Sequence, residues 1–391
     1  MSIQPSEFLH APVGGTLVPG GATFRVWAPR AHAVHVSGDF NGWKHDTTSR
    51  MAPIGGGHWA SFVPGLKDGD PYLFHVEGTG LSDFKRDPRA RLLTFQPTFP
   101  SCNSVLRNAA GFPWHQTRFT PPAFNDLILY QLHVGTYAIA PGNGDGKFLD
   151  VIQRVAYLAS LGVNAIALLP IQEFPTMFSM GYNGADLYSP ENQYAETDAA
   201  RLQGYFDLTN AILRQAGQTP YGSTDVLRRS DDQLRALIDV CHVYGLSVIF
   251  DVVYNHAGGG FDPHSMWFFD RAPTADNNDS LYFTDQGWAG GLVFAYWNND
   301  VKQYLIDNAR FLYEEYRIDG LRFDEVSVMD RFGGWATCQD LTSTLRTAKP
   351  EAIQIADCAR PRRRRRRLRR YLDRRRARQR ARGDRKRIPR R

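Results

Sequence analysis

Five short apolar runs in the second part of the chain place the strongest limit on its fold. They span residues 127–134, 164–170, 246–253, 318–324 and 352–357. Each run is nearly continuous in apolar residues, which is typical of parallel strands that are covered on both faces. Helical segments alternate with these runs, and alternation of this kind predicts an α/β domain built on a parallel sheet.

Two of the intervening helices have clear sequence signals. Ser230 and Gln233 form a capping-box pattern, and Gly245 suits the end of the same helix. Its expected buried face is Leu234, Leu237, Ile238 and Cys241. A second helix is expected after residues 297–300. Its expected buried face is Val301, Tyr304, Leu305, Leu312 and Tyr316.

The region before residue 111 has a different texture. Residues 20–110 contain short β-branched and aromatic runs separated by Gly, Pro and Asp turns, which predicts an all-β sandwich over about 15–110. Residues 111–124 are Pro-rich and aperiodic and are interpreted as a linker. The α/β domain then spans 125–358.

The last residues are dominated by arginine. Residues 360–391 contain 19 Arg, one Lys and two Asp, a formal charge of +18, which leaves −12 on residues 1–359. The tail, 359–391, is expected to be disordered. It could also be a basic arm for nucleic acid, a role that no other part of the chain suggests. The abrupt change at Asp357 favours a third interpretation, a slip of reading frame.

Composition narrows the remaining classes. Four cysteines lie far apart, so neither a disulfide framework nor a metal site with paired cysteines is expected. No apolar run approaches the length of a membrane span, and the first residues do not resemble a secretion signal. A cytoplasmic protein without cofactor or metal is therefore expected.

Polar residues end several of the predicted strands, at His133, Asp251, Asp324 and Asp357. In a β/α barrel the carboxyl ends of the strands build the active site. Arg322 lies two residues before Asp324, so the two side chains share one face of the strand. An arginine favours the ionised form of a neighbouring carboxyl, which can then act as a nucleophile. A structural ion pair and ordinary helix caps are the alternatives.

Several motifs resemble a known family. The segments "DVVYNH" (251–256) and "IDGLRFDEV" (318–326) are similar to the first two signature regions of the α-amylase superfamily, glycoside hydrolase family 13. The segment "MGYNGADLYSPE" places Tyr182 where that family has a sugar-lining aromatic residue. The segment "FRVWAPRAHAVHVSGDFNGW" resembles family 48 carbohydrate-binding modules. Residues 291–329 resemble glycogen branching enzymes, whereas "DVVYNH" is closer to debranching and trehalose-releasing relatives.

The resemblance implies a retaining mechanism on α-1,4-glucans with two carboxyl groups. It assigns Asp324 as nucleophile, and Arg322, His256, Asp251 and Tyr182 as substrate-binding residues. Asp357 stands where the family has its acid/base glutamate and is one methylene shorter. The implied fold is a (β/α)8 barrel, of which about five strands can be counted, so the barrel is expected to be incomplete. Asn255 falls where some relatives bind calcium, but no metal is expected.

These observations predict a branching-enzyme-like chain acting on glycogen or other α-glucans, with little or no catalysis because the glutamate and later strands are missing. An α-glucan hydrolase is the nearer alternative. A non-catalytic glucan binder is the alternative from another class, and Trp27, Trp43 and Trp59 are its candidate sugar-stacking residues. Core positions are at least as good an interpretation for each of these tryptophans.

Overall fold

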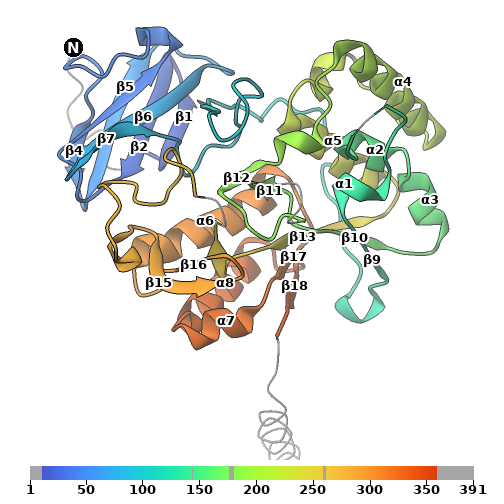
Figure 1. Cartoon of the computed structure of the whole chain (residues 1–391). Helices are drawn as coiled ribbons and strands as arrows, with labels where there is room; N and C mark the ends of the chain where they lie inside the picture. Colours follow the sequence, from blue (N-terminus) through green and yellow to red (C-terminus); the bar gives the residue numbers. More distant parts are fainter. Residues whose placement is uncertain (1–10, 143, 176–179, 259–260, 359–391) are drawn as a thin grey trace, which may run out of the picture.

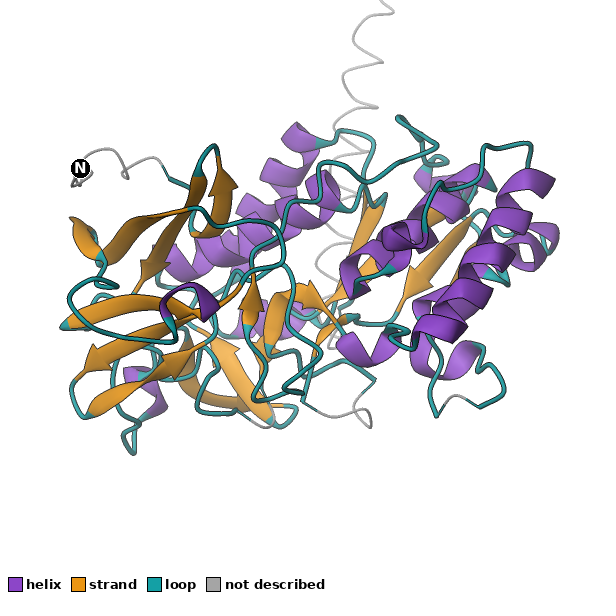
Figure 2. Ribbon diagram, turned by 90° about the horizontal axis from the view of Figure 1, so that it is seen from above, coloured by secondary structure: helices purple, strands orange, loops and turns teal. Residues whose placement is uncertain are grey.

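The computed structural model describes residues 11–142, 144–175, 180–258 and 261–358. A β-rich N-terminal domain, blue in Figure 1, lies beside an α/β domain that ends in the red elements. Seen from above, strands prevail in the first domain and helices in the second (Figure 2). The Arg-rich tail at 359–391 lies outside the described residues, so its expected disorder stays a prediction.

The N-terminal domain is a pair of antiparallel sheets, with strand orders β1-β2-β5-β4 and β3-β6-β7, and β8 pairs with β6. Phe24 on β2 contacts Tyr72 and Phe74 on β6 edge-on, at 4.9 and 6.4 Å between ring centroids. All three rings are buried, so the inner faces of the two sheets form one core. The strands are β1 Gly14–Val18, β2 Gly21–Trp27, β3 Ala33–Gly38, β4 Ala52–Gly55, β5 His58–Pro64, β6 Pro71–Gly78, β7 Leu81–Lys85 and β8 Ser104–Val105.

A five-stranded parallel sheet forms the centre of the second domain, in the order β18-β17-β13-β10-β9. Each apolar run from the sequence contains one of its strands, so the predicted parallel sheet is confirmed. The strands are β9 Leu129–Leu132, β10 Ala165–Leu168, β13 Ser247–Val252, β17 Gly320–Phe323 and β18 Ile353–Ala356. They are shorter than the runs, although some residues beyond the strand ends, such as Asp324 and Asp357, still donate a backbone hydrogen bond to the neighbouring strand.

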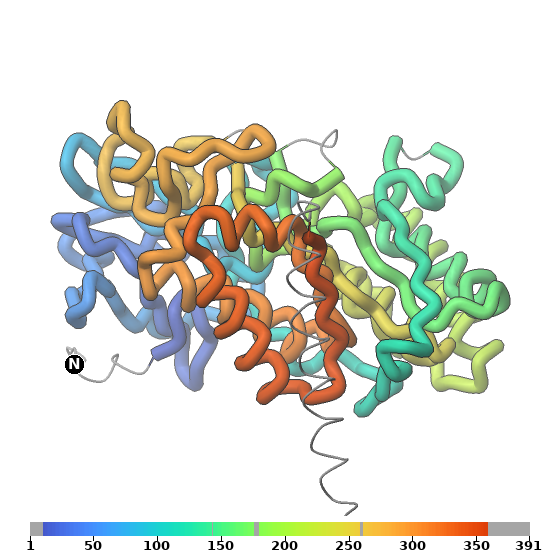
Figure 3. Tube along the Cα trace, turned by 90° about the horizontal axis from the view of Figure 1, so that it is seen from below, coloured from blue at the N-terminus to red at the C-terminus, as the bar shows by residue number. Residues whose placement is uncertain are grey.

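Helices connect these strands. They are α1 Val134–Tyr137, α2 Phe148–Ile152, α3 Val155–Ser160, α4 Ala199–Gln215, α5 Ser230–Val243, α6 Asn299–Glu315, α7 Val326–Arg331 and α8 Trp335–Ala348. The side chain of Asn298 accepts from the Asp300 amide and starts α6, and the predicted apolar face of this helix is buried. Seen from below, the orange and red elements lie between the blue domain and the green helices (Figure 3).

The predicted capping box at the start of α5 is wrong. The cap position is Arg229, without a side-chain cap. Ser230 Oγ instead donates to Asn192 Oδ1 at 3.0 Å, and Gln233 Nε2 donates to the carbonyls of Glu196 and Leu227. These buried side chains form hydrogen bonds with loop residues that pack on the helix. Partners so distant in sequence leave no local sequence pattern. The helix ends as expected, with Gly245 at a φ of +76°.

Two smaller sheets extend from the central one. The ribbon of β11 (Gln172–Glu173) and β12 (Asp186–Pro190) carries the loop with Tyr182. The second is β14 (His256–Ala257), β15 (Phe283–Trp288) and β16 (Gly291–Phe294). Both leave from the carboxyl ends of the central strands, so they can deliver side chains to that edge.

A buried arginine joins the two domains. Arg86, with a fully buried side chain, follows β7 and pairs with Asp186 on β12 and with Asp262, at 2.9 and 2.8 Å. The segment 111–124, which the sequence predicts to be a linker, has no strand or α-helix and packs on the second domain: Phe119 stacks on His242 of α5. The domains therefore have a fixed orientation.

The three candidate tryptophans have different environments. Trp27 and Trp59 are 7% and 8% exposed. Trp27 packs edge-on against Tyr282, and Trp59 Nε1 donates to the Ala28 carbonyl at 3.1 Å. Both are core residues. Trp43 is half-buried, and it keeps its candidacy as a sugar-stacking residue.

Candidate active site

Arg322 is the centre of a cluster of carboxylates at the carboxyl ends of the central strands. Its NH1 nitrogen contacts both oxygens of Asp251, at 2.8 and 2.6 Å, and Oδ1 of Asp324 at 3.0 Å. Its NH2 nitrogen contacts Oδ2 of Asp357 at 2.5 Å. The register explains the assembly, since Arg322 lies directly beside Asp251 on β13 and Ile355 on β18.

Asp324 is held from both sides. While Arg322 binds one carboxylate oxygen, Asn255 Nδ2 donates to the other at 2.9 Å and also to the Asp324 carbonyl at 2.9 Å. The Asp324 amide continues the ladder by donating to the Val252 carbonyl. The Asp324 side chain is 13% exposed, so an oriented carboxylate faces a partly open edge of the sheet.

Asp251 is the most buried of the three carboxylates, at 1% side-chain exposure. Burial raises its pKa to about 6, against the lowering effect of hydrogen bonds from Arg322 and Tyr182. The Tyr182 hydroxyl donates to Asp251 Oδ2 at 2.9 Å. The loop between β11 and β12 is thereby fastened to the end of β13.

His256 is buried beside this cluster, and burial lowers its pKa below the ordinary value of 6.5. The ring is therefore neutral at pH 7. Its Nδ1 contacts the side-chain oxygen of Asn255, and within the described residues its Nε2 has no hydrogen-bond partner. A buried ring nitrogen without a partner can bind a ligand hydroxyl.

The side chains of Asp357 and Glu325 point to different partners. The Asp357 side chain is 45% exposed and contacts Arg322, while its amide donates to the Phe323 carbonyl. Glu325 has a φ of +36°, a left-handed conformation that is uncommon without glycine. Its carboxylate accepts from Trp288 Nε1 at 2.7 Å.

The structure brings together Asp251, His256, Arg322, Asp324 and Asp357 with Tyr182. His133 does not join them, because its ring contacts Thr136 and Tyr194. Sequence reasoning missed the anchoring role of Asn255, although it lies in the same "DVVYNH" motif. Among the described residues, no group of three or more His, Cys, Asp or Glu side chains is placed to hold a metal ion.

Both domains resemble known proteins. Residues 12–90 match the model of carbohydrate-binding module 48, the isoamylase N-terminal domain. The 1,4-alpha-glucan branching enzyme of Nitratidesulfovibrio vulgaris (strain Hildenborough) is 31% identical over 79% of this chain and 44% of its own length. That of Desulfitobacterium hafniense is 29% identical over 86% of this chain and 51% of its own length.

The chain is a relative of the 1,4-alpha-glucan branching enzymes. Its N-terminal domain is a carbohydrate-binding module 48. The chain spans about half or less of the length of these branching enzymes.

Solved structures show the same fold. A pullulanase from Anoxybacillus sp. LM18-11, complexed with maltotriose, has a TM-score of 0.67 and 21% identity over 91% of this chain and 50% of its own. A putative alpha amylase from Salmonella typhimurium has a TM-score of 0.65 and 23% identity over 88% and 49%. At these identities the likeness concerns the fold alone. No helix within the described ranges is long and apolar enough to cross a bilayer.

Proposed function

We propose that the cluster around Arg322 is the glucan-binding and nucleophile half of a retaining site of the branching type, acting on glycogen or other α-1,4-glucans. The observation that carries this proposal is the orientation of Asp324, which Arg322 and Asn255 fix from opposite sides. The curated relatives are named 1,4-alpha-glucan branching enzymes, which supports the substrate class.

In the proposed reaction an Asp324 oxygen attacks the anomeric carbon, C1, of a glucosyl unit. The bond from C1 to the leaving O4 breaks, and that oxygen takes up a proton. His256 Nε2 and the Tyr182–Asp251 pair would bind hydroxyls of the same unit. The 6-hydroxyl of a second glucan then attacks C1, loses its proton to a base and releases Asp324. Water in place of that hydroxyl would give hydrolysis.

We further propose that Asp357 is a weak acid/base group for this reaction. The family has a glutamate here, and aspartate reaches one methylene less far. Its Oδ2 contacts Arg322 at 2.5 Å, so one of its two oxygens is already engaged by the cluster. Because general acid–base catalysis contributes about 10²–10⁴-fold, we expect little turnover of ordinary glucans.

The central sheet would belong to a (β/α)8 barrel, of which the described residues supply five strands. A cytoplasmic location and the absence of nucleic-acid and membrane partners remain proposals of the same kind. An α-glucan hydrolase of the amylase, debranching or trehalose-releasing type is the alternative enzyme. A glucan-binding protein without turnover is the alternative from another class, favoured by the half-buried Trp43.

α-Maltotriosyl fluoride separates these functions, because fluoride leaves without being protonated. We expect fluoride release by the full chain and by Asp357→Asn, and none by Asp324→Asn. With added amylose, new α-1,6 bonds in the product support branching, and free maltotriose alone supports hydrolysis. Glycogen binding without fluoride release would overturn the enzymatic proposal in favour of the binding protein.

A further inference from the structure

Glu325, the residue after Asp324, makes a left-handed turn at the end of β17. Its φ and ψ are +36° and +55°, a conformation that residues with a side chain adopt rarely. Helix α7 begins at the next residue, and no side-chain cap supports its start. A strained backbone of this kind persists only where surrounding contacts hold it. The contacts of Glu325 therefore bear on the position of Asp324.

The turn at Glu325 also connects the ends of β17 and β18. The Val326 amide donates to the Asp357 carbonyl at 2.9 Å, and the Asp357 amide donates to the Phe323 carbonyl at 3.0 Å. The backbone on both sides of the turn is thus bonded to Asp357. A retaining site needs its two carboxyl groups about 5–5.5 Å apart. A change in this turn would alter the separation of Asp324 and Asp357.

Trp288 holds the side chain of Glu325. Its Nε1–H donates to Oε2 of the carboxylate at 2.7 Å, and both residues are half-buried. Hydrogen bonds to a carboxylate are stronger than those between neutral groups. Trp288 is the last residue of β15, and the tight turn to β16 follows at Ala289 and Gly290, with φ values of +47° and +89°. The bond therefore fastens the tip of the β15–β16 hairpin to the residue that follows Asp324.

The same hairpin packs closely on the strand of His256. β16 pairs antiparallel with β14, which contains His256 and Ala257. A Cβ atom on Gly291 of β16 would lie 2.2 Å from the Ala257 carbonyl oxygen and 2.9 Å from Cδ2 of the His256 ring, so only glycine fits there. The hairpin is therefore anchored on two residues at the end of the central sheet, His256 and Glu325.

We propose that Trp288 and Glu325 are a positioning pair for the Arg322 cluster. Through their hydrogen bond, the β15–β16 hairpin fixes the turn between Asp324 and the backbone of Asp357. The pair acts through these two residues and does not itself take part in bond making. Its effect on catalysis rests on the proposed function, whereas its hold on the turn can be measured without substrate.

Hydrogen exchange of the Val326 amide, followed by NMR in the full chain, tests the hold on the turn. Trp288→Phe and Glu325→Ala remove the hydrogen bond, and exchange should become about tenfold faster in both. Glu325→Gln keeps an oxygen that can accept the bond, so exchange should stay close to that of the unaltered chain. Trp335→Phe, which changes a tryptophan that is 55% exposed, is the matched control and should have no effect. Glu325 is half-buried, so its variants keep the fold even if Trp288→Phe does not.

Fluoride release from α-maltotriosyl fluoride tests the effect on the cluster. The maximal rate should fall about tenfold in Trp288→Phe and Glu325→Ala, while the half-saturating concentration stays the same, because the pair does not bind the sugar. Glu325→Gln should restore the maximal rate. A loss of folded protein would not give this pattern, since the conservative variant and the control would then have no reason to differ from Glu325→Ala in the rate per folded molecule.

The outcomes separate the two proposals. Unchanged exchange of the Val326 amide in Trp288→Phe and Glu325→Ala overturns the positioning pair and leaves the proposed function standing. Faster exchange with an unchanged rate of fluoride release overturns the effect of the pair on the cluster. Absence of fluoride release by the unaltered chain overturns the proposed function, and the exchange of Val326 then decides by itself whether the pair holds the turn.

Discussion

Tyr182 and Asp251 are 69 positions apart in sequence, and the tyrosine hydroxyl donates a 2.9 Å hydrogen bond to the carboxylate. The bond joins the loop between β11 and β12 to the end of β13. Because Asp251 also holds Arg322, the position of that loop and the orientation of the central arginine are coupled through one carboxylate. The first two predictions follow from this coupling.

Tyr182→Phe should raise the pKa of Asp251 further above about 6, because the hydroxyl stabilises the charged form. A hydrogen bond contributes about 1 kcal/mol, so the expected rise is up to about one pH unit. Carbon NMR titration of labelled aspartate measures it, with Tyr157→Phe, an exposed tyrosine, as control. An unchanged titration of Asp251 in Tyr182→Phe would show that this hydrogen bond does not influence the pKa of Asp251.

Glucan binding at the sheet end should strengthen as the pH rises through about 6. Asp251 is neutral below that value and ionised above it, and only the ionised form pairs fully with Arg322. Stability changes in the opposite sense. A carboxyl whose folded-state pKa lies above its ordinary 3.8 costs stability as the pH rises from about 4 to about 6. Two measurements between pH 4 and pH 7 check these directions. Hydrogen exchange of residues 180–184 gives the affinity for maltoheptaose, and urea unfolding gives the stability. Parallel trends would contradict the assignment.

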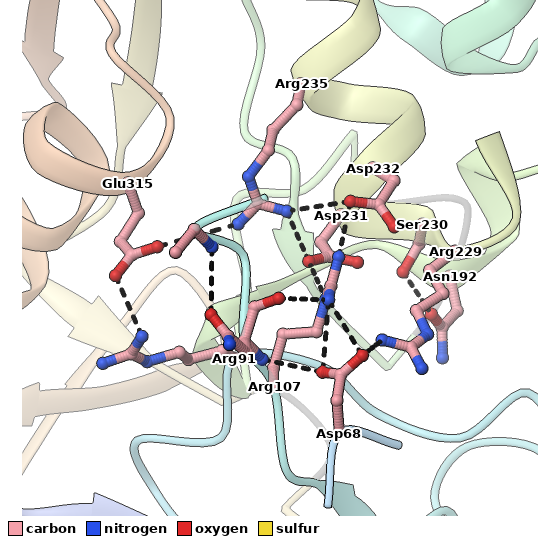
Figure 4. Close-up of polar contacts among 12 residues, drawn as sticks. Asp68, Arg91, Arg107, Asn192, Arg229, Ser230, Asp231, Asp232, Arg235 and Glu315 are labelled. Carbon is pink, nitrogen blue, oxygen red and sulfur yellow. Dashed lines mark hydrogen bonds and ion pairs between the residues drawn. The ribbon is translucent and has the colours of Figure 1, made fainter. Parts of the chain in front are cut away.

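Arg107→Ala should destabilise the full chain by about 1–3 kcal/mol, because Asp231 and Asp232 lose one of their two guanidinium partners and keep only Arg235 (Figure 4). The matched control is Arg310→Ala, which removes an exposed pair with Glu314 and should cost about 1 kcal/mol or less. Urea unfolding measures both. Equal, small losses of stability in the two variants would mean that the ion pairs of Arg107 with Asp231 and Asp232 do not stabilise the fold.

Trp59→Ala and Trp43→Ala should separate packing from binding. Trp59 is 8% exposed, and its removal should cost about 3–5 kcal/mol of stability. Trp43 is half-buried, so its removal should weaken glycogen binding and change the melting temperature much less. Co-sedimentation with glycogen and thermal melts provide the two readouts. Unchanged glycogen binding in Trp43→Ala would remove this residue from the binding surface.

The sequence predicts the central sheet because each parallel strand is buried on both faces and therefore shows a continuous apolar run. It also predicts that Arg322 and Asp324 share a face, since they are two residues apart on one strand. It does not predict that the same guanidinium binds Asp251 and Asp357, because that depends on the register between three strands.

Contacts between distant segments leave no local pattern. Arg107 meets Asp231 across 124 residues, and neither residue has a neighbour that signals the other. The start of α5 shows the same effect in reverse. Ser230 and Gln233 match a local capping pattern, but tertiary partners take both side chains. Local propensity therefore gives the elements, and their long-range pairing has to come from the structure.

The most direct test of the account is covalent trapping of the nucleophile with 5-fluoro-α-glucosyl fluoride. An Asp324 oxygen would form a bond to C1 as the C1–F bond breaks and fluoride leaves, without any need for an acid group. Peptide mass spectrometry should then find the 5-fluoroglucosyl group on Asp324, in the full chain and in Asp357→Asn. Labelling of another carboxylate would contradict the assignment of Asp324. So would the absence of labelling in a protein whose amides at 180–184 and 251–256 are still protected from hydrogen exchange by maltoheptaose.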